Sequence, residues 1–306
     1  GFYANGPVNG ITLDNLDVSG HPNTFGAARG IVIWNGFKQN ISITNCEVYN
    51  NNCCGIELQD GTASGVTMSN NNVHDNGDNG LGLSGLKAGA GANIISNNTI
   101  TNNGRFGIEV KNPNGNGTTS GDGSIYLDNN NVTFTASAGM NIRDHAGIAI
   151  IRIAFQSGNP DGYPNIPTGV VARNNTVAGY KHLNPSRIES EGFGIVVEGT
   201  NHEVTLNTIN NNDIGIQQQG GGHPNANYVE NNAGNGDQSD NKSALYFGRG
   251  NAHVACGNEI SSNTFSSNVI ADTRNSGSGV GGSGYVTNIV SGETFCSIQA
   301  AINDAQ

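Results

Sequence analysis

Cationic and acidic side chains that could carry out acid–base chemistry gather in one stretch of the chain. Arg143 and His145 fall in the segment IRDHAG, and Lys181, Arg187 and Glu189 fall in the segment KHLNPSRIESEG. Removing a proton next to a carboxylate requires a cation to neutralise that carboxylate, a base, and an acid for the leaving group. These five residues supply the side-chain types for all three roles. They are the candidate catalytic residues if the protein is an enzyme.

The same residues have a simpler interpretation as solvated surface charges. They lie several repeats or a loop apart, and exposed Arg and Glu side chains stabilise a fold little. Nothing in their spacing brings them together, so the non-catalytic interpretation is favoured. The chain also has no Cys-x-x-Cys pair and no Cys/His cluster with zinc spacing. We therefore expect no metal site and no cofactor.

The overall composition limits the partners of the protein. The formal net charge is −11, which disfavours a nucleic acid partner, because phosphate binding requires a basic surface. No run of 18 apolar residues occurs, so no membrane insertion is expected. Only 12% of the residues are charged and 46 are glycine, a composition also found in disordered chains. Evenly spaced β-branched pairs nevertheless favour a folded chain.

Cysteine usage leaves the redox state open. The chain contains Cys46, Cys53, Cys54, Cys256 and Cys296. This odd number permits two disulfides and a spare thiol, whereas free thiols buried in a core are equally compatible with it.

The strongest signal is a repeated Gly-Ile-x-apolar motif. The first copies are GIVIWN, GIELQD, GLGLSG and GIEVKN, and their glycines lie 25, 25 and 27 residues apart. Later copies begin at Gly147, Gly194 and Gly215. Each unit predicts two or three strands of four to six residues, joined by Gly/Asn turns. Because so short a unit cannot bury its own apolar face, neighbouring units must stack into a solenoid.

A second motif places an asparagine at one position of each unit, in stretches such as MSNNNVHDN and ISNNTITNN. Parallel stacking sets equivalent residues about 4.8 Å apart, so each amide can donate to one neighbour and accept from the other. The first two units carry Leu16 and Cys46 here, so the ladder should begin at the third. The predicted ladder consists of Asn71, Asn98, Asn130, Asn175, Asn207 and Asn263.

These motifs, over residues 8 to about 290, closely resemble the right-handed parallel β-helix of the pectin-lyase-like superfamily in its short-repeat form. The resemblance implies an all-β, right-handed parallel β-helix solenoid with an Asn ladder, spanning residues 1–290. We find no motif of the best-known epimerases or pectate lyases of this fold, and no calcium-binding Asp cluster typical of the latter. The fold alone therefore does not define a chemistry.

Two coils are too long to be plain turns of the solenoid. Asn130 and Asn175 are 45 residues apart, and Asn207 and Asn263 are 56 apart. The excess predicts loops at residues 157–167 and 220–241. Long loops on one side of a solenoid are common binding sites.

The last residues, 291–306, have a helical pattern. Phe295, Ile298, Ile302 and Ala305 are spaced three, four and three residues apart, which predicts an amphipathic helix. The segment SIQAAINDAQ resembles the helix that caps the N-terminal end of β-helices in this superfamily. It predicts the cap of a following β-helix module; a local cap of the same domain is the alternative.

The segment GFGIVVEGTNHEVTLNTINNNDIGIQ resembles repeats of large bacterial surface and adhesin-like proteins. We therefore predict a non-catalytic structural or adhesive module of a larger, filament-forming or surface protein, located outside the cell or at its surface. Its expected partners are neighbouring modules, copies of itself, and a polysaccharide. The alternatives are a lyase or epimerase acting on an acidic polysaccharide, and a non-catalytic glycan-binding module.

Overall fold

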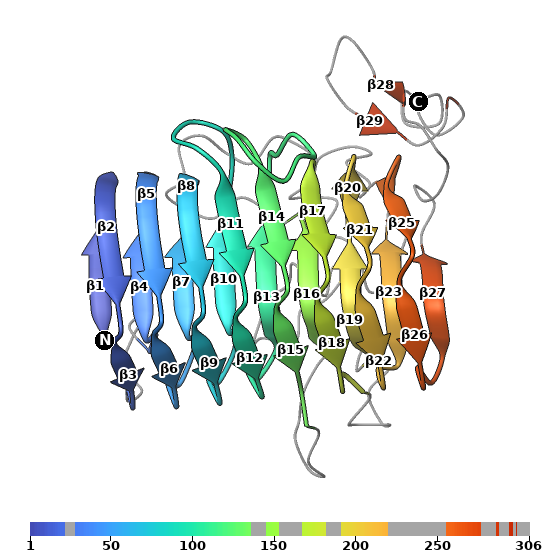
Figure 1. The fold of residues 1–306 in the computed structure, drawn as a ribbon, viewed down its shortest axis with the longest axis horizontal. Coiled ribbons are helices and arrows are strands. Elements are labelled where there is room, and N and C mark those ends of the chain that lie inside the picture. Colours follow the sequence, from blue (N-terminus) through green and yellow to red (C-terminus); the bar gives the residue numbers. More distant parts are fainter. Residues whose placement is uncertain are drawn as a thin grey trace, which may run out of the picture.

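The protein is described by a computed structural model in which most of the chain forms one solenoid (Figure 1). The described residues are 1–21, 28–135, 145–152, 167–181, 191–219, 255–276, 286–287, 294–295 and 298. Within these ranges the chain is all-β apart from the helical residue Ile298. It winds as a right-handed parallel β-helix, in which each complete coil adds one strand to each of three parallel sheets.

Sheet A starts each coil, and neighbouring strands in it come from successive coils. Its strands are β1 (Phe2–Asn5), β4 (Ile31–Trp34), β7 (Ile56–Gln59), β10 (Leu81–Ser84), β13 (Phe106–Lys111), β16 (His145–Ile151), β19 (Gly192–Val197), β23 (Ile214–Gln219) and β27 (Ala271–Ser276).

Sheet B follows sheet A in each coil, and its strands are also parallel. They are β2 (Val8–Asp14), β5 (Phe37–Thr44), β8 (Thr62–Ser69), β11 (Asn93–Ser96), β14 (Ile125–Asp128), β17 (Val170–Arg173), β21 (Glu203–Thr205) and β25 (Glu259–Ser261).

Sheet C closes each coil with strands of three residues. They are β3 (Asp17–Ser19), β6 (Glu47–Tyr49), β9 (Asn72–His74), β12 (Thr99–Thr101), β15 (Asn131–Thr133), β18 (Thr176–Ala178), β22 (Thr208–Asn210) and β26 (Thr264–Ser266). Two short pairs lie outside the three sheets: β20 (Gly199–Thr200) with β24 (Ala255–Cys256), and β28 (Val286–Thr287) with β29 (Thr294–Phe295).

The core consists of columns of apolar side chains that run along the solenoid. In sheet A, Ile33, Leu58 and Leu83 occupy equivalent positions on successive strands, and each is fully buried. Burying a side chain of this size contributes about 1.5 to 3 kcal/mol. Because the inward positions repeat in every coil, the core is continuous from coil to coil.

The repeated glycine is required because sheet A packs closely against side chains of sheet C at this position. A Cβ atom added at Gly107 would lie 2.2 Å from Cγ1 of Val132, and one added at Gly55 would lie 2.4 Å from Cγ1 of Val73. Both valines belong to sheet C. The Gly-Ile motif therefore marks the place where one sheet packs against the side chains of another, and a side chain at the glycine position has no room.

The Asn ladder is confirmed at all six predicted positions, immediately before sheet C. The Nδ2 group of Asn71 donates to Oδ1 of Asn98 at 2.9 Å, and that of Asn207 donates to Oδ1 of Asn263 at 3.0 Å. Intermediate rungs repeat this bond. The ladder begins at the third coil, where the backbone N–H of Cys46 donates to Asn71 Oδ1.

A second Asn ladder follows sheet C, five residues after the first. Asn51 donates to Asn76, and Asn76 donates to Asn103, both at 2.9 Å. The ladder resumes at Asn212, which donates to Asn268 at 3.2 Å. We did not predict this ladder, although the five-residue interval is present in stretches such as NNVHDN. The two ladders satisfy buried backbone groups at both corners of sheet C.

The residue before each ladder position turns the corner in the left-handed backbone region. Asn70 and Asn97 have φ angles of 56°, a conformation that asparagine tolerates better than other residues with a side chain. Two coils depart from this pattern: Ser262 occupies the equivalent position with φ 56°, and Leu206 does so with φ 60° and an exposed side chain.

The end of the chain differs in part from the prediction. Phe295 was placed on the face of a helix, but Thr294–Phe295 form strand β29, which is antiparallel to β28. Ile298 is helical and 67% exposed. The other residues of 291–306 lie outside the described ranges, so the cap helix stays a prediction. Within the described part of the chain, no helix is long and apolar enough to span a membrane.

Candidate functional site

The predicted catalytic set is only partly covered by the structure. Arg143, Arg187 and Glu189 lie outside the described residues, as do most residues of the two predicted loops. The structure brings His145 and Lys181 together, with His145 Nε2 lying 2.8 Å from the backbone oxygen of Lys181. That contact uses the backbone of Lys181 and not its ammonium group, so it does not form an acid–base pair.

His145 has a packing role in the described structure. It is 1% exposed, and its ring lies edge-on to Phe134 at 5.1 Å and beside Tyr180 at 5.3 Å. This aromatic group occupies the corner where the second Asn ladder is interrupted: Tyr180 stands five residues after Asn175, at the ladder position. His145 therefore fills a gap in the ladder and is withdrawn from the surface that a substrate would reach.

Two arginines that lie near these candidates in the sequence are divided between two sheets. Arg173 on sheet B forms an ion pair with Glu203 at 2.5 Å. Arg152 follows strand β16 of sheet A, where its backbone N–H donates to Glu198 at 2.8 Å. The structure thus separates these two arginines instead of converging them on one groove.

The structure reveals a different polar group, on the outward side of sheet A, which we call the sheet A polar cluster. Eight of its nine members lie on or next to strands β4, β7, β10 and β13, and most of the nine are buried. The ninth, Lys38, lies on β5 of sheet B and joins the cluster through the backbone oxygen of Asp60. The nine members are Arg29, Trp34, Lys38, Glu57, Gln59, Asp60, Asn79, Glu109 and Lys111. We missed this cluster because outward positions of a Gly-Ile-x-apolar strand are usually solvated. The signal was the charged residue at x in GIELQD and GIEVKN.

One half of the cluster is built around Arg29 and Trp34. The Arg29 guanidinium forms an ion pair with Glu57 and lies over the Trp34 ring, 5.1 Å from its centroid. Trp34 in turn donates through Nε1 to the Asp60 carboxylate at 2.9 Å. These contacts join two successive strands of sheet A, since Trp34 ends β4 whereas Glu57 belongs to β7.

Lys38 is the most deeply buried cation of the cluster, with 0% of its surface exposed. Its ammonium group donates to the backbone oxygens of Asp60 and Gly36. Burial lowers the pKa of Lys38 to about 8, against the opposing effect of Asp60. Burial likewise raises the pKa of Asp60, because the cations nearby compensate the loss of hydration only in part.

The other half of the cluster is centred on Lys111. Its ammonium group lies 3.3 Å from the Glu109 carboxylate and donates to Gln59 Oε1 at 3.4 Å. Asn79 donates to the same Glu109 carboxylate at 2.5 Å. Burial lowers the pKa of Lys111, but the Glu109 and Glu57 carboxylates outweigh burial and hold it above its ordinary value.

These contacts define what the cluster can do. Each of its three carboxylates accepts a hydrogen bond or ion pair from a residue of the same cluster, and Lys111 reaches Gln59 two strands away. A carboxylate held in this way is poorly placed to take a proton from a substrate. Removing one partner of such a buried pair typically costs about 3 to 5 kcal/mol. The cluster therefore ties neighbouring coils together.

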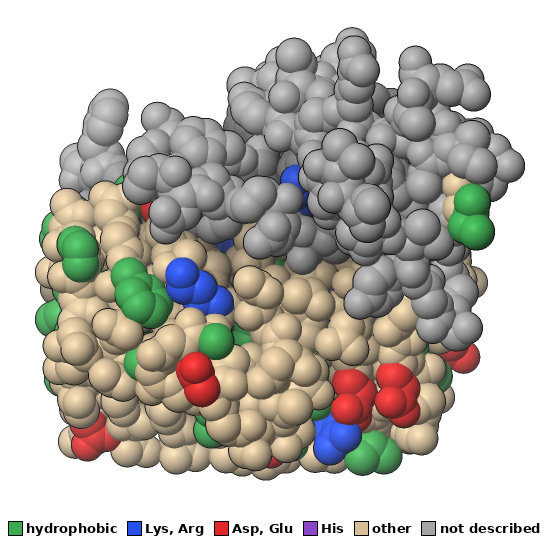
Figure 2. Space-filling model, turned by 90° about the horizontal axis from the view of Figure 1, so that it is seen from above, with side chains coloured by type: hydrophobic (Ala, Val, Ile, Leu, Met, Phe, Trp, Pro, Cys, Tyr) green, Lys and Arg blue, Asp and Glu red, His purple; other side chains and the backbone are tan. Residues whose placement is uncertain are grey.

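The described surface carries few charges. Figure 2 shows that uncharged polar side chains and backbone dominate the visible part of the described surface, with a few cationic and acidic groups between them. This agrees with the 12% of charged residues in the chain.

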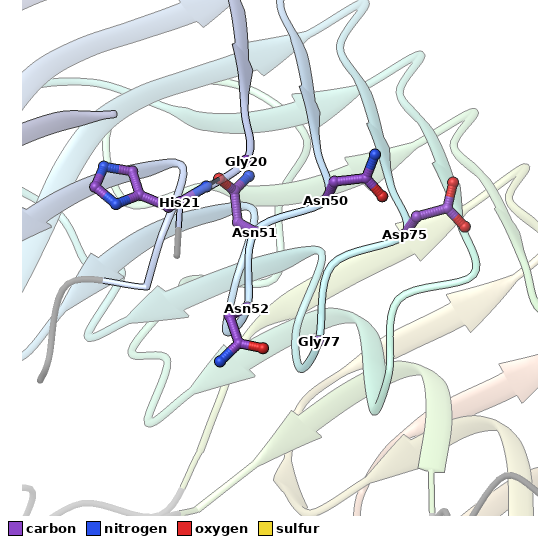
Figure 3. A pocket seen from close by; sticks show the side chains of 7 residues that line it. All are labelled: Gly20, His21, Asn50, Asn51, Asn52, Asp75 and Gly77. Atoms are coloured by element: carbon purple, nitrogen blue, oxygen red, sulfur yellow. Dashed lines mark hydrogen bonds between the residues drawn. The ribbon is translucent and has the colours of Figure 1, made fainter. Parts of the chain in front are cut away.

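A hollow of about 410 Å³ lies at the corner that follows sheet C in the first three coils (Figure 3). Its lining is Gly20, His21, Asn50, Asn51, Asn52, Asp75 and Gly77. Next to it, the rings of Tyr49 and His74 stack at 5.0 Å with an angle of 7°. Burial lowers the pKa of His74, but hydrogen bonds to Asp75 and Glu47 outweigh burial and raise it.

The structure describes four of the five cysteines. Cys46, Cys53 and Cys54 are free thiols, whereas Cys256 is disulfide-bonded. None of the other described cysteines is the partner of Cys256.

Comparison with known proteins supports the fold and does not indicate a function. A family model described as "Right handed beta helix region" matches residues 2–90 and, in an overlapping match, residues 29–119. The chain is thus similar to this family over its first coils, which is less than half of its length. No curated protein and no solved structure matches the chain. The matched region and the three parallel sheets agree on a right-handed parallel β-helix.

Proposed function

We propose that this protein is a structural, non-catalytic module of a larger surface or filament-forming protein, related to the pectin-lyase-like β-helices. In this proposal it works by stacking end to end on other β-coils. Such a module would form part of an adhesin-like protein built from similar repeats.

The observation that carries the proposal is the incomplete burial of the apolar side chains of the first coil. Ile11 and Leu13 of β2 are only partly buried, although their equivalents on the next coil, Ile41 and Ile43, are 1% and 0% exposed. The strands β1, β2 and β3 also lie at the edge of their sheets. An apolar edge strand with free backbone groups is a template for another strand. A further coil stacked here would bury these side chains to the level of the interior coils.

Two other features support the proposal. The sheet A polar cluster uses its charges to hold coils together, as a rigid scaffold requires. The disulfide of Cys256 fits an oxidising compartment outside the cytosol, because structural disulfides persist in secreted and surface proteins.

Sedimentation velocity of the full chain over a range of protein concentrations tests the proposal. We expect concentration-dependent assembly of the wild type through the first coil. Leu13→Lys places a charge at the partly buried apolar edge and should abolish this assembly. Thr12→Lys is the matched control, because Thr12 is exposed on the same strand and points away from the core. A wild type that stays monomeric, or assembly that survives Leu13→Lys with an unchanged circular dichroism spectrum, would refute it.

A glycan-binding module is the second candidate, favoured by the hollow in Figure 3. Three of its side chains, those of Asn50, Asn52 and Asp75, are exposed, and amide and carboxylate groups bind sugar hydroxyls well. Calorimetric titration with neutral and acidic oligosaccharides tests this candidate. Binding that is lost in Asn52→Ala but kept in Asn131→Ala, an exposed asparagine far along the chain, would support it, and an absence of binding would dismiss it. The lyase or epimerase alternative stays a prediction.

A further inference from the structure

We propose that Cys53, Cys54 and Asp78 form a binding site for Zn²⁺ or a similarly thiophilic divalent cation such as Cd²⁺. Two thiolates and one carboxylate are a ligand set that Zn²⁺ accepts, and three protein ligands leave a fourth position for water. The sequence did not suggest this site, because the ligands combine a vicinal cysteine pair with an aspartate one coil further on.

The geometry of the three ligands suits a single ion. Their ligand atoms, Sγ of Cys53, Sγ of Cys54 and a carboxylate oxygen of Asp78, all lie within 4.8 Å of one another. Metal–ligand distances of about 2.3 Å for sulfur and about 2.0 Å for oxygen place two ligands of one tetrahedral ion roughly 3.5 to 3.8 Å apart. The two sulfurs, now 2.6 Å apart, need only a side-chain rotation to reach that separation.

The backbone holds the ligands in register. Cys53 and Cys54 lie in the turn between β6 and β7, and Asp78 lies in the corresponding turn one coil on, between β9 and β10. The backbone N–H of Asp78 donates to the oxygen of Cys53 at 2.5 Å, and the N–H of Cys53 donates to Ala28 at 2.8 Å. The stacking of the coils therefore sets Asp78 beside the cysteine pair before any ion binds.

The surrounding charges support an anionic ligand set. Two thiolates and a carboxylate around a divalent ion carry a net charge of −1. Arg29 is close enough to both thiols, and Arg105 close enough to Asp78, for their charges to interact. The Glu57 carboxylate, which pairs with Arg29, acts in the opposite sense on Cys54 and Asp78.

Protons must leave the site when the ion binds. The hydrogen bond with Cys53 and burial together raise the pKa of Cys54, so this thiol is protonated in the metal-free protein. Burial raises the pKa of Asp78 to about 6. Ligation by a metal replaces these protons, as at other thiolate sites.

The site is accessible from solvent. Cys53 and Asp78 are partly exposed, whereas Cys54 is 1% exposed. The hollow of Figure 3 is lined by Asn52 and Gly77, the residues that directly precede Cys53 and Asp78 in the chain. An ion and its water ligand can therefore approach from this side.

The test is a titration of the reduced full chain with Cd²⁺, followed by the ultraviolet sulfur-to-cadmium charge-transfer absorption. We expect saturation at one ion per chain and competition for the same site by an excess of Zn²⁺. Cys53→Ser and Cys54→Ser should each abolish the absorption, and Asp78→Asn should weaken binding by about tenfold or more. Cys46→Ser is the matched control, because Cys46 is also a free thiol but lies outside the site, and it should bind as the wild type does.

Two results would overturn the proposal. One is the absence of the absorption in protein whose thiols have been shown by titration to be free. The other is an absorption that persists in Cys53→Ser or Cys54→Ser, which would place the ion elsewhere. A circular dichroism spectrum of each variant shows whether it has kept the fold.

Discussion

Replacing Asn130 with alanine removes the amide at the centre of the first Asn ladder. Asn130 is 1% exposed, and its Nδ2 group donates to Asn175 Oδ1 and to the backbone oxygen of Ile95, both at 2.9 Å. Its Oδ1 atom accepts from Nδ2 and from the backbone N–H of Asn98, at 2.9 and 3.1 Å. The substitution therefore deletes four hydrogen bonds and leaves two donors of Asn98 buried without this acceptor.

The expected loss of stability follows from these four bonds. A buried hydrogen bond contributes about 1 kcal/mol net, and a buried donor left without a partner costs about 1 to 3 kcal/mol. We expect Asn130→Ala to lower the free energy of unfolding by about 4 to 6 kcal/mol, a large part of the stability of an ordinary domain. The last rung should matter less, because Asn263 is only half-buried and makes three such bonds.

Urea unfolding followed by circular dichroism measures this loss of stability, and amide hydrogen exchange shows which coils are destabilised. Exchange is needed because long repeat arrays do not always unfold in one step. Asn131→Ala is the control, since Asn131 is the adjacent residue of the same type and is exposed. The reasoning fails if Asn130→Ala costs less than about 1 kcal/mol, or no more than Asn131→Ala does.

Three further predictions concern single positions of the fold. Gly107→Ala should destabilise the protein by about 2 to 3 kcal/mol, because the new methyl group meets Cγ1 of Val132 and the backbone oxygen of Gly147; a loss that is no smaller in a Val132→Ala background would contradict the contribution of Val132. Leu206→Asn should raise the free energy of unfolding by about 1 kcal/mol, because asparagine tolerates φ 60° and little packing is lost; an unchanged urea midpoint would argue against backbone strain. Burial lowers the pKa of His202 to about 4, so the unfolded chain takes up its proton first as the pH falls. The contribution of neutral His202 to the free energy of unfolding is complete above pH about 6.5 and is lost towards pH 4, by about 3 kcal/mol in total. His202→Asn should therefore flatten the plot of urea midpoint against pH in this window; a plot as steep as that of the wild type would refute the assignment.

The ladder and the Gly-Ile motif were predictable because their chemistry repeats with the coil. Asn71 and Asn98 occupy equivalent positions, and parallel stacking alone makes their amides neighbours. Gly107 belongs to a motif that is visible in the sequence. The steric need for glycine at this position, however, is explained only by the packing of sheet C against it. Periodic features of this kind require no knowledge of long-range contacts beyond the stacking itself.

Features that interrupt the period were not predictable in the same way. His145 was a candidate catalytic residue by type, but the aromatic neighbours that withdraw it from the surface lie far along the chain, at the end of the preceding coil and at the end of its own coil. Glu57 and Glu109 were passed over as outward-facing residues, since only the folded structure shows which cations and amides reach them. Spacing alone does not predict the direction and length of such side chains.

The two ladders also determine where this chain can change in length. Successive rungs of the first ladder are separated by 27 to 56 residues, yet Asn71 and Asn76, like Asn207 and Asn212, remain five residues apart. An insertion inside that interval would shift one ladder against the other and unpair both corners of sheet C. An insertion in a connection between two sheets only lengthens that connection, whereas an insertion inside a strand of sheet A or sheet B would shift the register of that strand. Evolution, or an engineer who wishes to attach a tag or a second domain, can therefore extend the connections that lead into or out of sheet A without disturbing either ladder.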